Sequence, residues 1–217
     1  MAQITAAMVK DLREKTGAGI MDCKSALKEK DGDVEAALIF LREKGLASAA
    51  KKGGRVTSEG LVASYIHAGG RIGVMVEVNC ETDFVARTDA FVDFVNDIAM
   101  HIAAAAPVAL RREDMPADMV DTERGIFRTQ ALDSGKPEKI VEKIIDGKIE
   151  KFFKENCLME QAFVKDTDLS IDDYVKQMIS KTGENLSIRR YARFVMGEGL
   201  EKRSCDLAQE VAEQLGK

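Results

Sequence analysis

The chain has 217 residues, of which 45% are hydrophobic and 32% charged, a composition typical of a soluble protein with one or two packed domains. Its formal net charge of −5 disfavours broad binding to nucleic acid, and no apolar run reaches the ~18 residues of a membrane span. Four scattered cysteines without a CxxC pair, and no apolar signal-peptide segment in the first 15 residues, predict a cytoplasmic protein without a metal site.

The first 45 or so residues predict three short helices. Ile4, Met8 and Leu12 recur every four residues and therefore line one face of the first helix. The turn Thr16–Gly19 ends this helix, because glycine permits the positive φ of a helix terminus. A second helix is predicted from Ile20 to Lys30.

A third helix and a linker follow. Asp33 is a suitable N-cap for this helix, and Gly45 is its predicted C-cap. Residues Ser48 to Ser58 are rich in Ala, Lys and Gly and are predicted to form a linker. Its basic cluster, Lys51–Arg55, is typical of a solvated tether, although contact with a phosphate or an acidic partner stays open.

Residues 61–106 predict a β-hairpin and a helix. The strands are Leu61–His67 and Arg71–Asn79, whose β-branched residues alternate, and Ala68–Gly70 is the turn between them. The helix is predicted from Thr88 to Ala106, with an apolar face that suits packing on a sheet.

Residues Pro116–Asn156 predict two long helices separated by Ser134–Pro137. Helices joined by so short a turn usually pack antiparallel, so we expect a helical hairpin that projects from the body. Gly147 inside its second helix should weaken that helix by roughly 1 kcal/mol relative to alanine.

The remaining segment predicts Gln161–Lys165 as a short edge strand or loop, a helix at Ile171–Lys181, a strand at Leu186–Val195 and a last helix at Lys202–Leu215. Strict alternation would divide the faces of this strand into two sets, Arg189, Tyr191 and Arg193 on one and Ile188, Ala192 and Phe194 on the other. The predicted fold class is α+β: a small antiparallel three-stranded sheet with helices, plus the projecting hairpin.

The residues do not predict an enzyme. The two histidines, His67 and His101, lie at a hairpin end and on a long helix, and neither accompanies a nucleophile motif. There is no P-loop or GxGxxG motif, and no cofactor is expected.

The most distinctive stretch is Asn79–Ala86, where a strand hands over to a helix. Such junctions place working residues on a rigid support, and here they carry a carboxylate, Asp83, beside an apolar ring, Phe84. The pair suggests a probe that inserts into another molecule. In the alternative interpretation, which stays open, Asp83 caps the next helix and Phe84 packs inward.

Five segments together resemble the bacterial elongation factor Ts family, the nucleotide exchange factors of elongation factor Tu. Two of them, residues 9–24 (VKDLREKTGAGIMDCK) and 77–86 (EVNCETDFVA), look like signatures of that family. The others are residues 134–137, 183–190 and 197–199. Residues 134–137 resemble the turn of the family's coiled-coil insertion. The resemblance covers nearly the whole chain.

The resemblance implies a function and a set of partner-binding residues. It implies that the chain binds the G domain of elongation factor Tu and promotes GDP release by disturbing the magnesium and phosphate site. The exchange wedge matches Thr82, Asp83, Phe84 and Val85. A three-helix, ubiquitin-associated-like (UBA-like) module docks on the G domain through positions that match Lys10, Leu12, Arg13, Ile20 and Met21.

The chain departs from long family members, which carry two copies of the core. The resemblance implies that its single core merges features of both copies: His67 and Arg71–Gly73 match the second copy, and Thr82–Phe84 match the first. The resemblance therefore adds His67 as a partner contact and implies a homodimer formed through the sheet faces.

The implied organisation has five parts. They are a UBA-like docking domain at 1–50, a linker at 51–59, an α+β core at 60–114 and 163–200, a helical hairpin (coiled coil) at 115–162 and a C-terminal helix at 201–217. Two rival functions remain: an adaptor that uses only the N-terminal bundle, which would leave Asp83 and Phe84 without a role, and an enzyme of unknown type.

Overall fold

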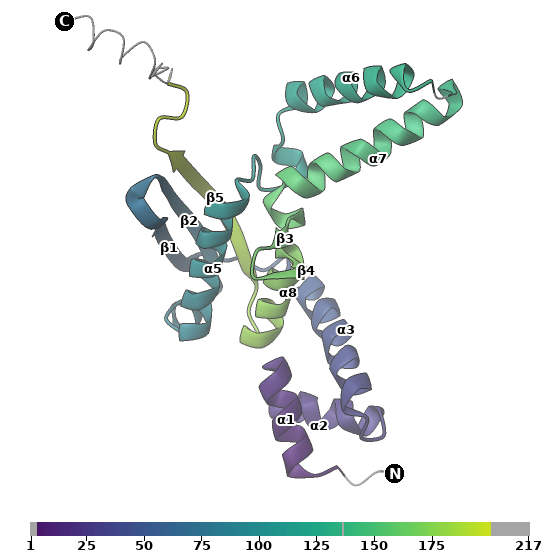
Figure 1. Cartoon of the computed structure of the whole chain (residues 1–217). Helices are drawn as coiled ribbons and strands as arrows, with labels where there is room; N and C mark the ends of the chain where they lie inside the picture. Colours follow the sequence, from purple (N-terminus) through teal and green to yellow (C-terminus); the bar gives the residue numbers. More distant parts are fainter. Residues whose placement is uncertain (1–3, 136, 201–217) are drawn as a thin grey trace, which may run out of the picture.

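The computed structural model describes residues 4–135 and 137–200 and shows a mixed fold of helices and small antiparallel sheets (Figure 1). This arrangement confirms the α+β class. The predicted last helix, Lys202–Leu215, lies outside the described residues. Within the described part of the chain, no helix is long and apolar enough to cross a membrane.

Three helices at the N-terminal end share a small core. They are α1 (Ala6–Thr16), α2 (Ile20–Glu29) and α3 (Val34–Lys52). Gly17 ends α1 in the left-handed region with φ 66°, and the Asp33 carboxylate caps α3 by accepting the N–H groups of its first turn. The buried members of this core are Val9, Leu12, Cys23, Ala26, Leu27, Ala37 and Leu41.

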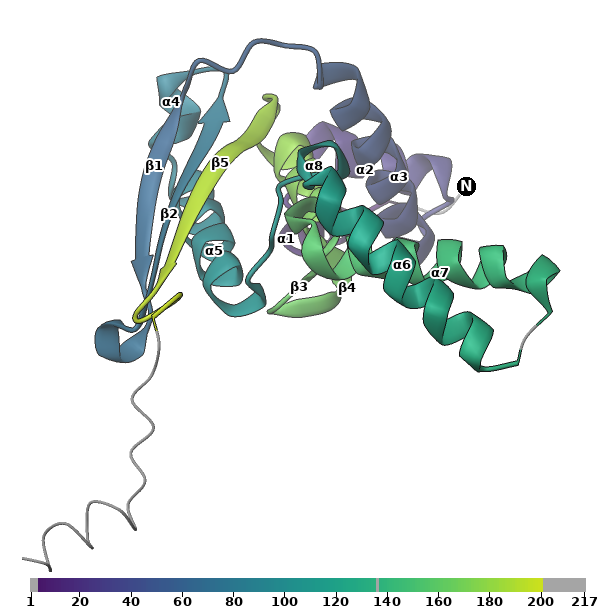
Figure 2. The ribbon, with the colours of Figure 1, turned by 90° about the horizontal axis from the view of Figure 1, so that it is seen from above.

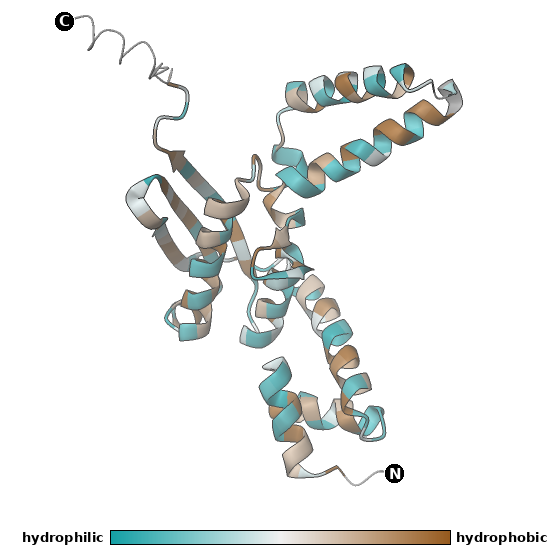
Figure 3. Cartoon of the chain, viewed as in Figure 1, coloured by the Kyte–Doolittle hydropathy of each residue, from teal (hydrophilic) through white to brown (hydrophobic). Residues whose placement is uncertain are grey.

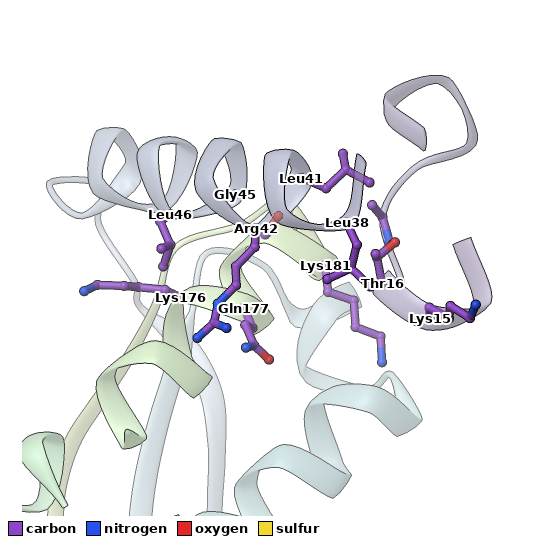
Figure 4. A pocket seen from close by; sticks show the side chains of 12 residues that line it. Lys15, Thr16, Leu38, Leu41, Arg42, Gly45, Leu46, Lys176, Gln177 and Lys181 are labelled. Carbon is purple, nitrogen blue, oxygen red and sulfur yellow. The ribbon is translucent and has the colours of Figure 1, made fainter. Parts of the chain in front are cut away.

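The third helix is longer than predicted, and the Gly45 C-cap was a wrong interpretation. Helix α3 continues through Gly45 to Lys52, so the linker cannot begin at Ser48. A Cβ atom at Gly45 would lie 2.8 Å from Oγ of Ser180 on α8 (Ile171–Thr182). Gly45 therefore permits close packing of two helices, and the hollow beside this contact is shown in Figure 4.

The central sheet has three antiparallel strands in the order β1–β2–β5: β1 (Glu59–Ile66), β2 (Ile72–Cys80) and β5 (Leu186–Val195). Helix α5 (Asp89–Ala105) covers one face of this sheet (Figure 2). Strands β1 and β2 are largely hydrophobic in Figure 3, whereas β5 also carries hydrophilic residues. Alternate residues of β2 are buried in the core that this sheet shares with α5. Thr88 is the N-cap of α5, which confirms the predicted start of this helix.

Strand β5 does not alternate strictly, which corrects the predicted division of its faces. Val78 of β2 pairs with Ile188 while the preceding Glu77 pairs with Arg190, so Arg189 is an extra residue in the ladder. This β-bulge turns Ile188 toward the core, on the same side as Tyr191. Ala192 and Phe194 remain exposed on the opposite face.

Helices α6 (Ala117–Asp133) and α7 (Glu138–Asn156) form the predicted antiparallel hairpin, which extends from the body in Figure 1. Their shared core consists of Ala131, Val141, Ile145 and Ile149. After α7 the chain forms β3 (Ala162–Phe163) and β4 (Asp166–Ser170), a separate two-stranded sheet. The segment predicted as an edge strand or loop thus contains a short strand.

Candidate functional site

The junction after β2 carries an exposed aromatic ring. A four-residue helix, α4 (Asp83–Ala86), follows the strand, and the Phe84 side chain is 81% exposed. Thr82 is the N-cap of α4, with its hydroxyl oxygen 3.5 Å from the N–H of Val85. The alternative in which Asp83 caps the next helix and Phe84 packs inward is therefore wrong.

The segment 81–86, named here the Phe84 loop, is held in place by contacts with the main core. Val85 and Ala86 pack against the main core, and the buried Cys80 thiol donates to the carbonyl oxygen of Thr82 at 3.1 Å. Burial raises the pKa of Cys80 to about 11, so this thiol stays protonated and serves as a donor. Asp83 forms an ion pair with Arg87, the residue that follows α4, at 2.9 Å.

A carboxylate from a distant segment also holds the Phe84 loop. Glu184, between α8 and β5, accepts the N–H of Glu81 at 3.1 Å, the N–H of Thr82 at 3.0 Å and the Thr82 hydroxyl at 2.6 Å. Sequence reasoning did not identify Glu184 as a functional residue. The only signal was its place in the turn Gly183–Asn185, which carried part of the family resemblance.

A second carboxylate, that of Glu81, bonds in the opposite direction, from the Phe84 loop to the turn that carries Glu184. Glu81 accepts the N–H of Asn185 at 2.6 Å, and the Asn185 side chain donates to the carbonyl of Arg55 at 2.9 Å. The guanidinium of Arg55 lies 3.4 Å from the Glu81 carboxylate. Glu81 and Glu184, named here the carboxylate clasp, therefore join the Phe84 loop to the start of β5 and to the segment that follows α3.

The N-terminal helices bring most of the predicted docking residues to one surface. Lys10 and Arg13 of α1 and Ile20 of α2 line a shared groove, and Ile20 is 53% exposed. Met21 is next to Ile20 in the sequence and 73% exposed. These four residues are named here the α1–α2 face; it combines two cations with two apolar side chains.

Leu12 does not belong to this face. Its side chain is 0% exposed and lies in the core shared by the three N-terminal helices. The match to the family pattern did not distinguish a contact residue such as Arg13 from the core residue next to it in the sequence. Leu12 therefore supports the α1–α2 face from beneath and cannot contact a partner directly.

His67 lies far from the Phe84 loop. It is exposed at the β1–β2 turn, where its Nδ1 is 3.2 Å from the Tyr65 hydroxyl. Figure 2 shows α4 at one end of the sheet and this turn at the other. Since β2 has nine residues, the two ends are roughly 25 Å apart. The structure does not bring His67 and Phe84 into one site.

The face of the sheet opposite α5, named here the outer face, is partly apolar. Its exposed hydrophobic members are Val62, Ile66, Met75, Ala192 and Phe194. On the same face, Glu77 pairs with Val62, and hydrogen bonds from Arg189 and Arg190, each 2.7 Å long, hold the pKa of Glu77 at about 2. Glu77 therefore stays ionised throughout the physiological range.

The second histidine has a structural environment. His101 is fully buried; its Nδ1 accepts the N–H of Val164 at 3.3 Å, so its Nε2 donates to the Gln161 side chain at 3.0 Å. Burial lowers the pKa of His101. Both ring nitrogens are thus used in packing α5 against the segment that follows α7.

The fold and these surfaces define a class of protein: an α+β body that presents an apolar ring on a braced strand-to-helix junction, beside a separate helical surface with exposed apolar side chains. Such an arrangement is suited to contact with another macromolecule.

Comparison with known proteins identifies the family. The sequence profile described as Elongation factor TS matches residues 47–198. The chain is 61% identical over 213 residues to Elongation factor Ts of Geobacter sulfurreducens, covering 98% of this chain and 99% of that protein. It is also 60% identical over 212 residues to Elongation factor Ts of Syntrophomonas wolfei subsp. wolfei, covering 98% and 99% respectively. The chain therefore belongs to the Elongation factor TS family, which supports a role as a translation elongation factor.

Proposed function

We propose that this chain is a guanine nucleotide exchange factor for elongation factor Tu and acts without catalysing a covalent step. The observation that carries the proposal is Phe84, a large apolar ring 81% exposed on a loop that is held by hydrogen bonds at Thr82 and by packing of Val85 and Ala86 against the core. Exposure of such a ring costs solvation free energy unless a partner covers it. Its place in the family signature supports the G domain of elongation factor Tu as that partner.

The mechanism rests on electrostatics at the partner's nucleotide site. Mg²⁺ is the largest local positive charge on the phosphates of bound GDP, and it needs closely defined ligand positions. Insertion of Phe84 beside this site shifts those ligands and weakens GDP binding without contact with the nucleotide. The partly exposed Asp83 carboxylate is the polar neighbour of the ring, and Thr82 and Val85 complete the wedge. Coupling is reciprocal, so GDP weakens the grip of this chain by the same factor.

We infer that the N-terminal helices, residues 1–50, form a UBA-like module that docks on the G domain. Lys10, Arg13, Ile20 and Met21 are the contact residues in this proposal. The exposed apolar pair supplies buried area in the complex, and the two cations favour an acidic surface opposite. Leu12 contributes only by supporting the helices.

We further propose a homodimer through the outer face of the sheet, in which each chain contributes one Phe84 loop. The exposed apolar side chains of this face support the proposal, because they would be covered by the same face of a second copy. His67 is proposed as an additional partner contact, separate from the wedge. The α6–α7 hairpin is the proposed coiled coil, and the proposed location is the cytoplasm.

Stopped-flow release of labelled GDP from elongation factor Tu tests the exchange function. Adding the wild-type chain should accelerate release at substoichiometric concentration, because the chain is recovered after each exchange. An unchanged release rate would refute the exchange function. Light scattering tests the dimer: we expect twice the chain mass, with loss of the dimer in Phe194→Glu, and a wild-type monomer would refute this part.

A further inference from the structure

The Phe84 loop lies beyond the hydrogen-bonded ladder of the sheet. The ladder ends at Cys80, which pairs with Glu59 on one side and Leu186 on the other. The next two N–H groups, those of Glu81 and Thr82, have no strand partner and bond instead to one oxygen of Glu184. The direction in which the chain leaves β2 therefore depends on this carboxylate.

Helix α4 cannot fix its own orientation. It has four residues, and a single helical turn is unstable in isolation because nucleation fixes several dihedral angles for one hydrogen bond. Its N-cap, Thr82, is also the residue that Glu184 grips through both its N–H and its hydroxyl group. The contact with Glu184 thus sets the position of the helical turn that carries Phe84.

The clasp also reaches the segment that connects the N-terminal helices to the sheet. The side chain of Asn185, the neighbour of Glu184, donates to the carbonyl of Arg55, three residues after α3 ends at Lys52. The proposed docking module and the Phe84 loop are therefore tied to the same turn between α8 and β5. Movement of this turn would change the position of the ring relative to the helices.

We propose that Glu184 is a positioning residue for nucleotide exchange: it holds Thr82 so that Phe84 enters the partner at the productive angle. The inference rests on the proposed exchange function. Glu184 is 102 residues from Thr82 in the chain and acts only through the loop. Its loss should therefore lower the maximal rate of GDP release more than the affinity for elongation factor Tu.

The test compares Glu184→Ala with Glu184→Gln in stopped-flow GDP release at increasing chain concentration. Alanine removes all three acceptor contacts, and we expect the maximal rate to fall about tenfold. Glutamine can accept both N–H groups through its carbonyl oxygen and donate to the Thr82 hydroxyl, so its rate should stay within about twofold of wild type. An unchanged rate in Glu184→Ala, or no rescue by glutamine, would overturn the proposal.

Tyr191→Phe is the control for a loss of core stability alone. The Tyr191 hydroxyl donates to the carbonyl of Pro107 at 2.8 Å, in the same core and away from the Phe84 loop. This variant should have a lower melting temperature and an unchanged maximal rate. If Glu184→Ala loses no more exchange activity than Tyr191→Phe, its role is merely structural and the proposal fails.

A double-mutant cycle tests whether Glu184 acts through Phe84. If it does, Phe84→Ala combined with Glu184→Ala should release GDP no more slowly than Phe84→Ala alone. Additive losses would contradict the inference. Hydrogen exchange at the amides of Glu81 and Thr82 examines the clasp in the isolated chain, with protection expected in wild type and lost in Glu184→Ala. This readout distinguishes failure of the clasp from failure of the exchange function itself.

Discussion

The Phe84 loop and the α1–α2 face both expose apolar side chains, but they are supported in different ways. The loop is fixed by hydrogen bonds from segments about 100 residues away and rests on the main core of the molecule. The α1–α2 face is supported by a small core that only the three N-terminal helices contribute.

If the chain acts as the proposed exchange factor, this difference suits the two surfaces to different tasks. A ring that must displace groups inside a folded partner needs a rigid support, because a flexible support would yield before the partner does. A docking surface needs only exposed area and complementary charge, and small adjustments of its helices cost little. The Phe84 loop should therefore control the rate of exchange, and the α1–α2 face the affinity of the complex.

Removal of the core beneath the α1–α2 face should have the largest effect. Leu12→Ala leaves a cavity in a fully buried position and should destabilise the N-terminal helices by about 3 kcal/mol. Such a small core has little stability to lose. Hydrogen exchange in α1 measures this change, and Ile20→Ala, at an exposed position, is the control. Equal protection of α1 in Leu12→Ala and wild type would contradict a separate N-terminal core.

Truncation of the ring should have the next largest effect. Phe84→Ala should lower the maximal rate of GDP release roughly 30-fold, equivalent to about 2 kcal/mol for an interfacial aromatic anchor. The fold should be unaffected because the ring makes little contact with its own chain. Val164→Ala, which shortens another exposed apolar side chain, is the stopped-flow control. Full activity of Phe84→Ala would keep the exchange function but remove the wedge.

Polar substitutions on the docking face should weaken binding without slowing exchange at saturation. In the double variant Ile20→Ser and Met21→Ser, we expect the dissociation constant of the complex to rise about tenfold, as measured by calorimetry. Ile39→Ser, which changes a comparably exposed residue on α3, outside the α1–α2 face, should leave the constant near the wild-type value. A variant whose affinity is intact would exclude this face from docking.

The smallest expected effect is the pH dependence of the free energy of unfolding. It concerns the core of the body that carries both surfaces. Burial lowers the pKa of His101 below its ordinary value of 6.5, so the unfolded chain takes up a proton before the folded chain does. The stabilising contribution is present above pH 6.5 and is lost as the pH falls, by at most about 1.4 kcal/mol per pH unit. Denaturant unfolding at several pH values should show this slope, and His101→Gln should reduce it.

Much of the fold could be predicted because it depends on local signals. Alternation located the β-hairpin, and the Ser134–Pro137 turn located the helical hairpin. The end of α3 could not be predicted, because Gly45 looks like a C-cap until the neighbouring Ser180 is known. The predicted face of Ile188 was wrong for a similar reason, because a β-bulge depends on how the strand pairs with its partner.

The candidate site was predictable to a similar degree. The family signature identified Phe84 and Asp83, and the structure supplies the exposure of the ring. The family signature could not separate Leu12, a core residue, from Ile20, an exposed one, because such a pattern includes residues of both kinds. Glu184 was missed because its partner Thr82 is 102 residues away, and no local pattern connects the two.

The division of tasks between the two surfaces can be tested in one set of saturation curves for GDP release from elongation factor Tu. The curves compare wild type, Phe84→Ala and the double variant Ile20→Ser and Met21→Ser. We predict that Phe84→Ala lowers the maximal rate with a nearly unchanged half-saturating concentration, and that the double variant raises this concentration with a nearly unchanged maximal rate. A change in the same parameter for both variants would contradict the account.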